Sequence, residues 1–174
     1  MTDRDAHYWI EHLGLKAHPE GGYYRETYRS DLKISRSALG NSFSGERSAS
    51  TAIYFLLAHK QCSSFHRIRS DELWHFHTGT SLLIHAIDAE GRLQSNRLGP
   101  DAVSGDDFQV TVPANCWFAA EVIDKSSFGL CSCTVSPGFD FKDFELASPV
   151  RLAEQFPQHK DLIHKMAGRD SNQS

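Results

Sequence analysis

The chain has 174 residues, a formal net charge of −4 and hydrophobic side chains at 40% of its positions. This length and composition predict one globular domain, residues 1–174, and the interspersed charges without a basic stripe argue against a nucleic-acid partner. The central apolar run, residues 52–58, is too short to cross a bilayer, and the charged N-terminus lacks the apolar core of a secretion signal. We therefore expect a cytoplasmic protein with no membrane partner, whose four cysteines are reduced thiols.

The first part of the chain predicts a short helix, a turn, a strand and a polar excursion. Apolar residues recur at helical spacing within residues 3–15. The pair Gly21-Gly22 then marks a turn, and residues 23–30 alternate as a strand does. Residues 31–48 are polar and rich in serine and glycine, which is typical of a long excursion or lid.

From residue 50 onward, short strand-like segments follow one another at close spacing. Turn residues at 78–81 and 88–91 predict tight antiparallel hairpins, and residues 157–166 predict a terminal helix before a frayed end. The predicted strands are 50–58, 63–68, 72–78, 81–88, 92–98, 108–112, 117–123 and 128–136. This many short strands in one domain indicate an all-β double-stranded jelly roll with short N- and C-terminal helices.

The segment FHRIRSDELWHFHTG, residues 65–79, resembles the first motif of the cupin superfamily, G-x5-H-x-H-x3,4-E-x6-G. His66, Glu72 and Gly79 fall on the motif, whereas Ile68 replaces its second histidine. Near Pro113 the second motif is altered, and Phe118 stands where the superfamily has its last metal-binding histidine. The resemblance therefore implies a cupin barrel in which two of the four metal-binding positions are lost.

Five segments, one of which contains the first motif, are similar to the fifth cupin family, long catalogued as a domain of unknown function. They are HPEGGYYRETYRS, STAIYFLL, SSFHRIRSDELWHFHTG, VPANCWFAAEV and CSCTVSPGFDFKDFELA, which together span residues 18–147. The resemblance implies a jelly-roll barrel with an apolar-lined pocket, a core at about 18–147 and a homodimer. It implies no assigned reaction, because a fold does not carry a function.

Strand alternation predicts which side chains face the interior of the barrel. If Glu72 points inward, Trp74 and Phe76 do so too, and His75 and His77 point outward. A hairpin at 78–81 would place Leu83 and His85 on the same inner face. The predicted pocket then holds the following residues: His66, Glu72, Trp74, Phe76, Leu83, His85 and Phe118. An aromatic-rich cavity with a few polar groups is typical of a small-molecule site.

Three interpretations of His66 and Glu72 stay open. They could be catalytic residues that move protons on a ligand, since burial raises the proton affinity of a carboxylate and histidine titrates near neutrality. They could instead form a structural hydrogen bond, or they could bind a divalent metal together with His85. Because two superfamily ligands are missing, we expect no metal cofactor.

Other candidate residues surround these strands. Arg25 and Arg47 flank the polar excursion and could bind a phosphate or carboxylate of a ligand, with Glu20 and Glu26 as their alternative partners. One of the tyrosines of residues 23–28 could reach the barrel mouth. The three phenylalanines of residues 139–144 are expected to pack in the core or in a dimer.

The sequence thus predicts a cupin that binds a small sugar-like or nucleotide-like molecule. The leading hypothesis is an isomerase or epimerase that uses His66 and Glu72 for proton transfer. The alternatives are a metal-dependent oxygenase or decarboxylase, and a non-catalytic binding or storage-like module.

Overall fold

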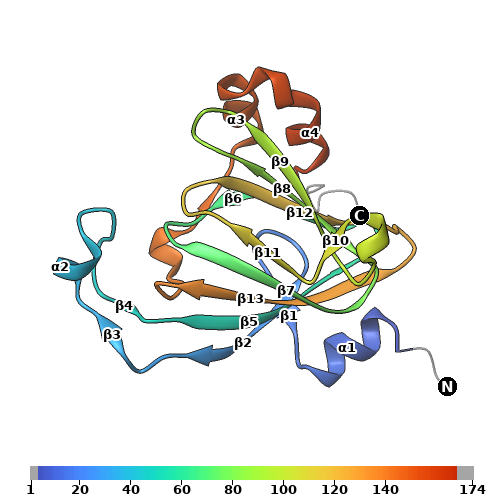
Figure 1. Ribbon diagram of the computed structural model, residues 1–174, viewed down its shortest axis with the longest axis horizontal. Helices are drawn as coiled ribbons and strands as arrows, with labels where there is room; N and C mark the ends of the chain where they lie inside the picture. Colours follow the sequence, from blue (N-terminus) through green and yellow to red (C-terminus); the bar gives the residue numbers. More distant parts are fainter. Residues whose placement is uncertain (1–3, 168–174) are drawn as a thin grey trace, which may run out of the picture.

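The computed structural model describes residues 4–167 and consists of two six-stranded sheets that face each other (Figure 1). The first sheet has the order β1 (Lys16–Ala17), β2 (Tyr23–Arg29), β5 (Thr51–Ala58), β13 (Phe128–Ser136), β7 (Asp71–Gly79) and β11 (Gln109–Val112). The second has the order β10 (Asp106–Asp107), β9 (Leu93–Leu98), β8 (Leu82–Ile87), β12 (Trp117–Val122), β6 (Cys62–Arg67) and β14 (Glu145–Leu146). This arrangement is the predicted jelly roll.

Three apolar clusters hold the layers together. The largest lies between the sheets and contains Phe55, Trp74, Ile84 and Phe118. A second joins the outer face of the second sheet to the C-terminal helices α3 (Pro149–Gln155) and α4 (Lys160–Lys165), and a third joins the first sheet to α1 (Ala6–His12). Because β12 is covered on both faces, its six residues are all buried, and its sequence is nearly continuously apolar rather than alternating.

The expected hairpin at residues 78–81 does not form. β7 belongs to the first sheet and pairs with β13 and β11, whereas β8 belongs to the second and pairs with β12 and β9. The intervening turn crosses from one sheet to the other. Gly79 is required there, because its φ is +94° and a Cβ would lie 2.1 Å from the carbonyl oxygen of Phe128. The hairpin expected at 88–91 does form, between β8 and β9.

The polar excursion is an arm rather than a lid. It contains β3 (Lys33–Ile34), α2 (Arg36–Leu39) and β4 (Arg47–Ser48), and β3 pairs with β4. Figure 1 shows it projecting from the end of β2 and β5. The sequence did not predict α3, and the frayed end expected at residues 168–174 lies outside the described residues.

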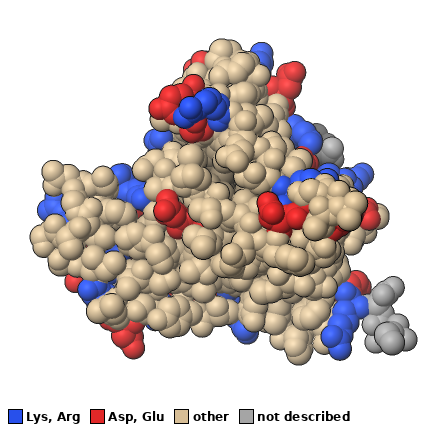
Figure 2. Space-filling view, viewed as in Figure 1, with Lys and Arg blue, Asp and Glu red and all other residues tan. Residues whose placement is uncertain are grey.

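The molecular surface carries charges of both signs. On the face shown in Figure 2, lysine, arginine, aspartate and glutamate side chains are scattered over a mostly uncharged surface, and the basic ones form no continuous stripe. Within residues 4–167, no helix has the length and apolar character needed to span a bilayer.

Candidate functional site

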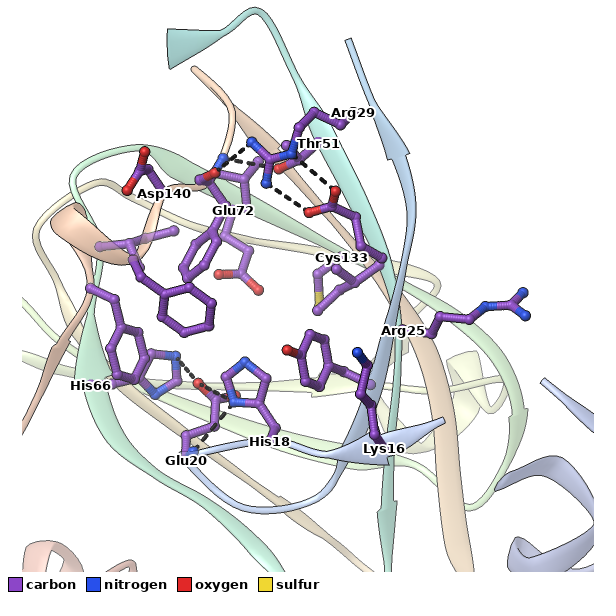
Figure 3. Close-up of a pocket in the computed structure, with 18 residues that line it drawn as sticks. Lys16, His18, Glu20, Arg25, Arg29, Thr51, His66, Glu72, Cys133 and Asp140 are labelled. Carbon is purple, nitrogen blue, oxygen red and sulfur yellow. Dashed lines mark hydrogen bonds and ion pairs between the residues drawn. The ribbon is translucent and has the colours of Figure 1, made fainter. Parts of the chain in front are cut away.

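A cavity of about 450 Å³ opens between the two sheets, within the size range of small-molecule sites. One wall comes from the first sheet, another from the end of β6, and a third from the loop that follows β13. Figure 3 shows its lining residues. Its polar side chains include His18, Glu20, His66, Glu72 and Cys133, and its aromatic ones are Tyr24, Phe139, Phe141 and Phe144.

The segment before β2 carries two of the polar groups, His18 and Glu20. Its backbone is tied to β6, because the Ser64 amide donates to the Glu20 carbonyl at 2.8 Å. Gly21 and Gly22 both have positive φ angles, and a Cβ at Gly21 would lie 2.2 Å from the Cys62 carbonyl oxygen. The glycine pair therefore allows the chain to approach β6 closely enough to place Glu20 beside His66.

His66 and Glu20 form a buried ion pair, with 2.9 Å between Nε2 and Oε2. The ring also donates its Nδ1 hydrogen to the Ser64 carbonyl at 2.8 Å, since a carbonyl can only accept. Burial alone would lower the pKa of His66, but the charge of Glu20 and the two hydrogen bonds outweigh it and raise that pKa. Burial likewise acts to raise the pKa of Glu20, yet His66 holds it below its usual value. The pair is thus an imidazolium and a carboxylate.

Glu72 lies on β7 and reaches the same cavity (Figure 3). Burial raises the pKa of its carboxyl group to about 7, against the smaller opposing effects of the His66 charge and of a hydrogen bond from the Cys133 thiol. Such a carboxyl group is present both as acid and as base near neutral pH.

His18 is the fourth charged or titratable side chain beside Glu20, His66 and Glu72 in this part of the cavity. Its Nδ1 accepts the backbone N–H of Glu20 at 3.3 Å and lies 3.5 Å from the Glu20 carboxylate. We assign the contact with the backbone as the hydrogen bond, because it is the shorter and its donor is fixed. Burial lowers the pKa of His18 and, together with the positive charge of His66, outweighs the raising effect of the Glu20 carboxylate, so the neutral ring is favoured at neutral pH.

The aromatic wall is held in place from the first sheet and from β4. Arg29 donates to the Phe139 carbonyl at 3.0 Å, and the Phe139 amide donates to Thr51 Oγ1 at 2.9 Å. Arg47 binds Asp143 through two hydrogen bonds of 2.6 Å, and both side chains are buried. Arg47, which was predicted to bind a ligand, does not line the cavity, and its guanidinium group instead anchors the loop.

The predicted pocket residues are only partly brought together. His66, Glu72 and Arg25 line the cavity, although in Figure 3 the Arg25 side chain points away from it, and its guanidinium group lies over Tyr54. Trp74 and Phe76 face inward as expected, but they belong to the apolar core and do not line the cavity.

Phe118 packs against the ring of His66, with 4.0 Å between the ring centroids. It supports the imidazole from the position where the superfamily motif has a metal ligand. The core cluster includes Phe118, whereas the cavity lining does not. The expectation that Phe118 lines the pocket is therefore not met.

His85 does not face the cavity, and neither does Leu83. On β8 it is Leu82, Ile84 and Ala86 that enter the core. His85 instead contacts Ser95 and Glu121, on the other face of the second sheet. The prediction failed because it rested on the hairpin at residues 78–81, and β7 and β8 lie in different sheets.

Sequence reasoning missed several cavity residues. His18, Lys16 and Cys133 were not selected, Glu20 was expected to pair with an arginine, and the phenylalanines were assigned to packing. The one available signal was the Gly21-Gly22 pair after Glu20, which marks a close backbone approach. Among the tyrosines, Tyr24 is the one that lines the cavity.

The family model described as "Cupin superfamily (DUF985)" matches residues 7–147. The chain belongs to the cupin superfamily. This cupin is 41% identical to protein SO0799 from Shewanella oneidensis, with a TM-score of 0.83 and coverage of 95% of this chain and 98% of that one. A hypothetical protein from Leishmania major gives 36% identity and a TM-score of 0.86, over 95% and 99% of the two chains. The uncharacterized protein YML079W of Saccharomyces cerevisiae is 29% identical over 74% of this chain and 68% of its own length.

More distant structures share the fold alone. Oxalate decarboxylase from Bacillus subtilis matches with a TM-score of 0.53 at 14% identity, over 88% of this cupin and 37% of that enzyme. Its Mn(II) centers are named in a related structure. At this identity, its substrate and metal are not transferred to the present chain.

The side chains of this cupin do not fit a metal of that kind. Ile68 and Phe118 replace two of the four superfamily ligands. Both ring nitrogens of His66 are engaged by Ser64 and Glu20, so its imidazolium form offers no lone pair to a metal. Across residues 4–167, no three histidine, cysteine, aspartate or glutamate side chains are grouped so that they could hold an ion.

Proposed function

We propose that this cupin binds a small organic molecule in the cavity and catalyses proton transfer on it, as isomerases and epimerases do, without a metal. The observation that carries the proposal is Glu72, a carboxyl group buried in the cavity wall whose pKa is raised to about 7. At neutral pH this group can remove a proton from a bound molecule and return it.

In this proposal His66 has a different role from the proton transfer, together with Glu72, that the sequence suggested. Both nitrogens of His66 are already hydrogen-bonded, so the ring has no free position from which to exchange a proton with a ligand. Its positive charge acts on Glu72 and favours the carboxylate form, which offsets part of the cost of burial. Glu72 is therefore the proton carrier, and His66 is a positioning residue fixed by Glu20.

The size and lining of the cavity support a small substrate. Apolar and aromatic side chains cover much of the wall, and Glu72 and His18 point into the cavity from opposite sides (Figure 3). This composition favours a ligand with an apolar body and one reactive polar end.

The test begins with mass spectrometry of the small molecules released when natively purified protein is denatured. The released compound is then incubated with fresh protein in D2O, and deuterium uptake at carbon is measured. We expect wild-type exchange to rise with pH through about 7, as Glu72 ionises. Glu72→Gln keeps the shape of the side chain and should reduce the exchange by roughly 100-fold or more.

The matched control is Glu121→Gln, which changes a buried glutamate outside the cavity lining. It should leave the exchange within about twofold of wild type. Release of an unchanged compound that never takes up deuterium would identify a binding module and refute the proposal. Wild-type exchange in Glu72→Gln would refute it equally.

A further inference from the structure

His18 has a hydrogen-bonding arrangement that fixes its tautomer. A backbone amide can only donate, so the 3.3 Å contact from the Glu20 N–H requires a lone pair on Nδ1 of His18. In a neutral ring, the single hydrogen must then lie on Nε2. None of the hydrogen bonds found among residues 4–167 uses this Nε2.

The ring of His18 is held in one orientation. Tyr24 packs edge-on against it with 4.5 Å between the centroids, and Phe55 and Phe144 make longer edge contacts. Figure 3 shows one ring nitrogen of His18 turned toward Glu20 and the other toward the interior of the cavity, where the Glu72 side chain also points. The free N–H and the carboxyl group thus face the same space from two sides.

We infer that His18 is a second catalytic residue, whose Nε2–H donates a hydrogen bond to the carbonyl oxygen of a small carbonyl compound while Glu72 removes a proton from the adjacent carbon. This inference rests on the proposed function and adds the substrate class to it. A histidine that donates in its neutral form leaves the local charge unchanged, next to the imidazolium of His66.

The chemistry is balanced without any co-reactant. The C–H bond breaks, its proton passes to the Glu72 carboxylate, and its electron pair forms the carbon–carbon double bond of an enolate. The negative charge that develops on the oxygen is stabilised by the His18 N–H. Delivery of the proton from Glu72 to the oxygen gives the enol, which completes the isomerisation and restores the carboxylate. Return of the proton to the same carbon regenerates the oxo acid.

The mouth of the cavity adds one further property of the substrate. Lys16 is an exposed lining residue, and no ion pair joins it to another of the described residues, whereas Arg29 is already paired with Glu26 at 2.7 Å. In Figure 3 the Lys16 side chain extends toward the cavity on the side of His18. A carboxylate next to the carbonyl group would meet this ammonium group, and an aromatic or aliphatic body would lie against the phenylalanine wall. The class is therefore a 2-oxo acid with an apolar side chain.

The tautomer is tested by NMR on protein labelled with 15N in its histidines. Two-bond 1H–15N correlation spectra distinguish the Nδ1–H, Nε2–H and doubly protonated rings, and His18→Phe assigns the resonance. We expect His18 to show the neutral Nε2–H pattern at and above neutral pH, because burial lowers the pKa of its ring. An Nδ1–H or imidazolium pattern at neutral pH would overturn the inference, while leaving the proposal for Glu72 intact.

The substrate class is tested by the binding of phenylpyruvate and of 3-phenylpropanoate, which lacks the carbonyl group, measured by calorimetry. Wild type should prefer the oxo acid by about tenfold, the value of one buried hydrogen bond, and His18→Phe should lose the preference. His18→Gln places an amide N–H near the position of Nε2–H and should restore it. His85→Phe, a change outside the cavity, should leave it unaltered.

Equal binding of the two acids to wild type, or an unchanged preference in His18→Phe, would contradict the role of His18. Failure of both acids to bind at millimolar concentration would contradict the substrate class. In either case the Glu72→Gln exchange experiment still decides the proposed function on its own. Thermal melting of His18→Phe checks that the aromatic replacement keeps the fold.

Discussion

Two buried histidine–glutamate pairs in this cupin use the same side chains in different ways. In the cavity, His66 Nε2 lies 2.9 Å from Glu20. On the other face of the second sheet, His85 Nε2 lies 3.4 Å from Glu121. All four side chains are less than 10% exposed.

The difference lies in the number of cations around each carboxylate. Glu121 also accepts hydrogen bonds from Lys125 at 2.8 Å and from Lys165 at 2.7 Å. Burial acts to raise its pKa, but the two lysines and His85 outweigh burial and lower it to about 2. His85 stays neutral because burial lowers its pKa. This cluster joins α4 to β12 and leaves no carboxyl group that titrates near neutrality.

The cluster of His18, Glu20, His66 and Glu72 in the cavity contains more carboxyl groups than cations. Its two glutamates, Glu20 and Glu72, share the single imidazolium of His66, and the neighbouring His18 is neutral. Glu20 takes the direct contact, and Glu72 is left with a pKa of about 7. The comparison shows that the local supply of cations, not the residue types, decides whether a buried carboxyl group is structural or able to exchange protons.

The largest effect is expected for Glu20→Gln, which removes the counter-ion of a buried imidazolium. We expect a loss of roughly 3–5 kcal/mol in the free energy of unfolding, measured by urea denaturation. His66 contributes stability that is complete below its ordinary pKa of 6.5 and is lost as pH rises through its raised pKa. The contribution of Glu20 is complete above 4.5 and is lost as pH falls through its lowered pKa, so the loss should be greatest between these values.

Glu72→Gln should increase the free energy of unfolding, whereas Glu20→Gln should decrease it. The folded pKa of about 7 exceeds the ordinary value of 4.5, so the folded state binds the Glu72 proton more tightly than the unfolded state does. The native group therefore lowers stability progressively as pH rises between these two values. Relative to wild type, Glu72→Gln should be stabilised by up to ~3 kcal/mol at pH 8 and by almost nothing at pH 4. A constant difference across this range would show that Glu72 titrates normally.

The smallest effect is expected at the His85–Glu121 pair, whose carboxylate also binds two lysines. The Lys165 ammonium group is more than half exposed, so Lys165→Ala should cost about 0.5–1 kcal/mol at low ionic strength. Raising the salt concentration to roughly 1 M should remove most of that difference, because salt screens exposed charges. The loss caused by Glu20→Gln should persist in the same salt. Equal salt sensitivity of the two variants would contradict the contrast between the clusters.

Much of the fold could be predicted from the sequence, and the candidate site only in part. Alternating patterns located the long strands, and the motif residues placed His66 and Glu72 at the cavity. His85 and Arg47 were misplaced, because a turn signal does not reveal whether the chain stays in one sheet, and an arginine does not reveal its partner. The single domain, the homodimer and the cytoplasmic location stay predictions.

By itself, the sequence determined the family, the strand order along the chain and the inward direction of Glu72, because side-chain alternation and motif spacing are local properties. Only the tertiary structure decided that His18 and Glu20, carried by a segment remote from β6 and β7 in the chain, meet His66 and Glu72. Proton affinity depends on burial and on the charges within a few ångströms, and packing alone brings those charges together.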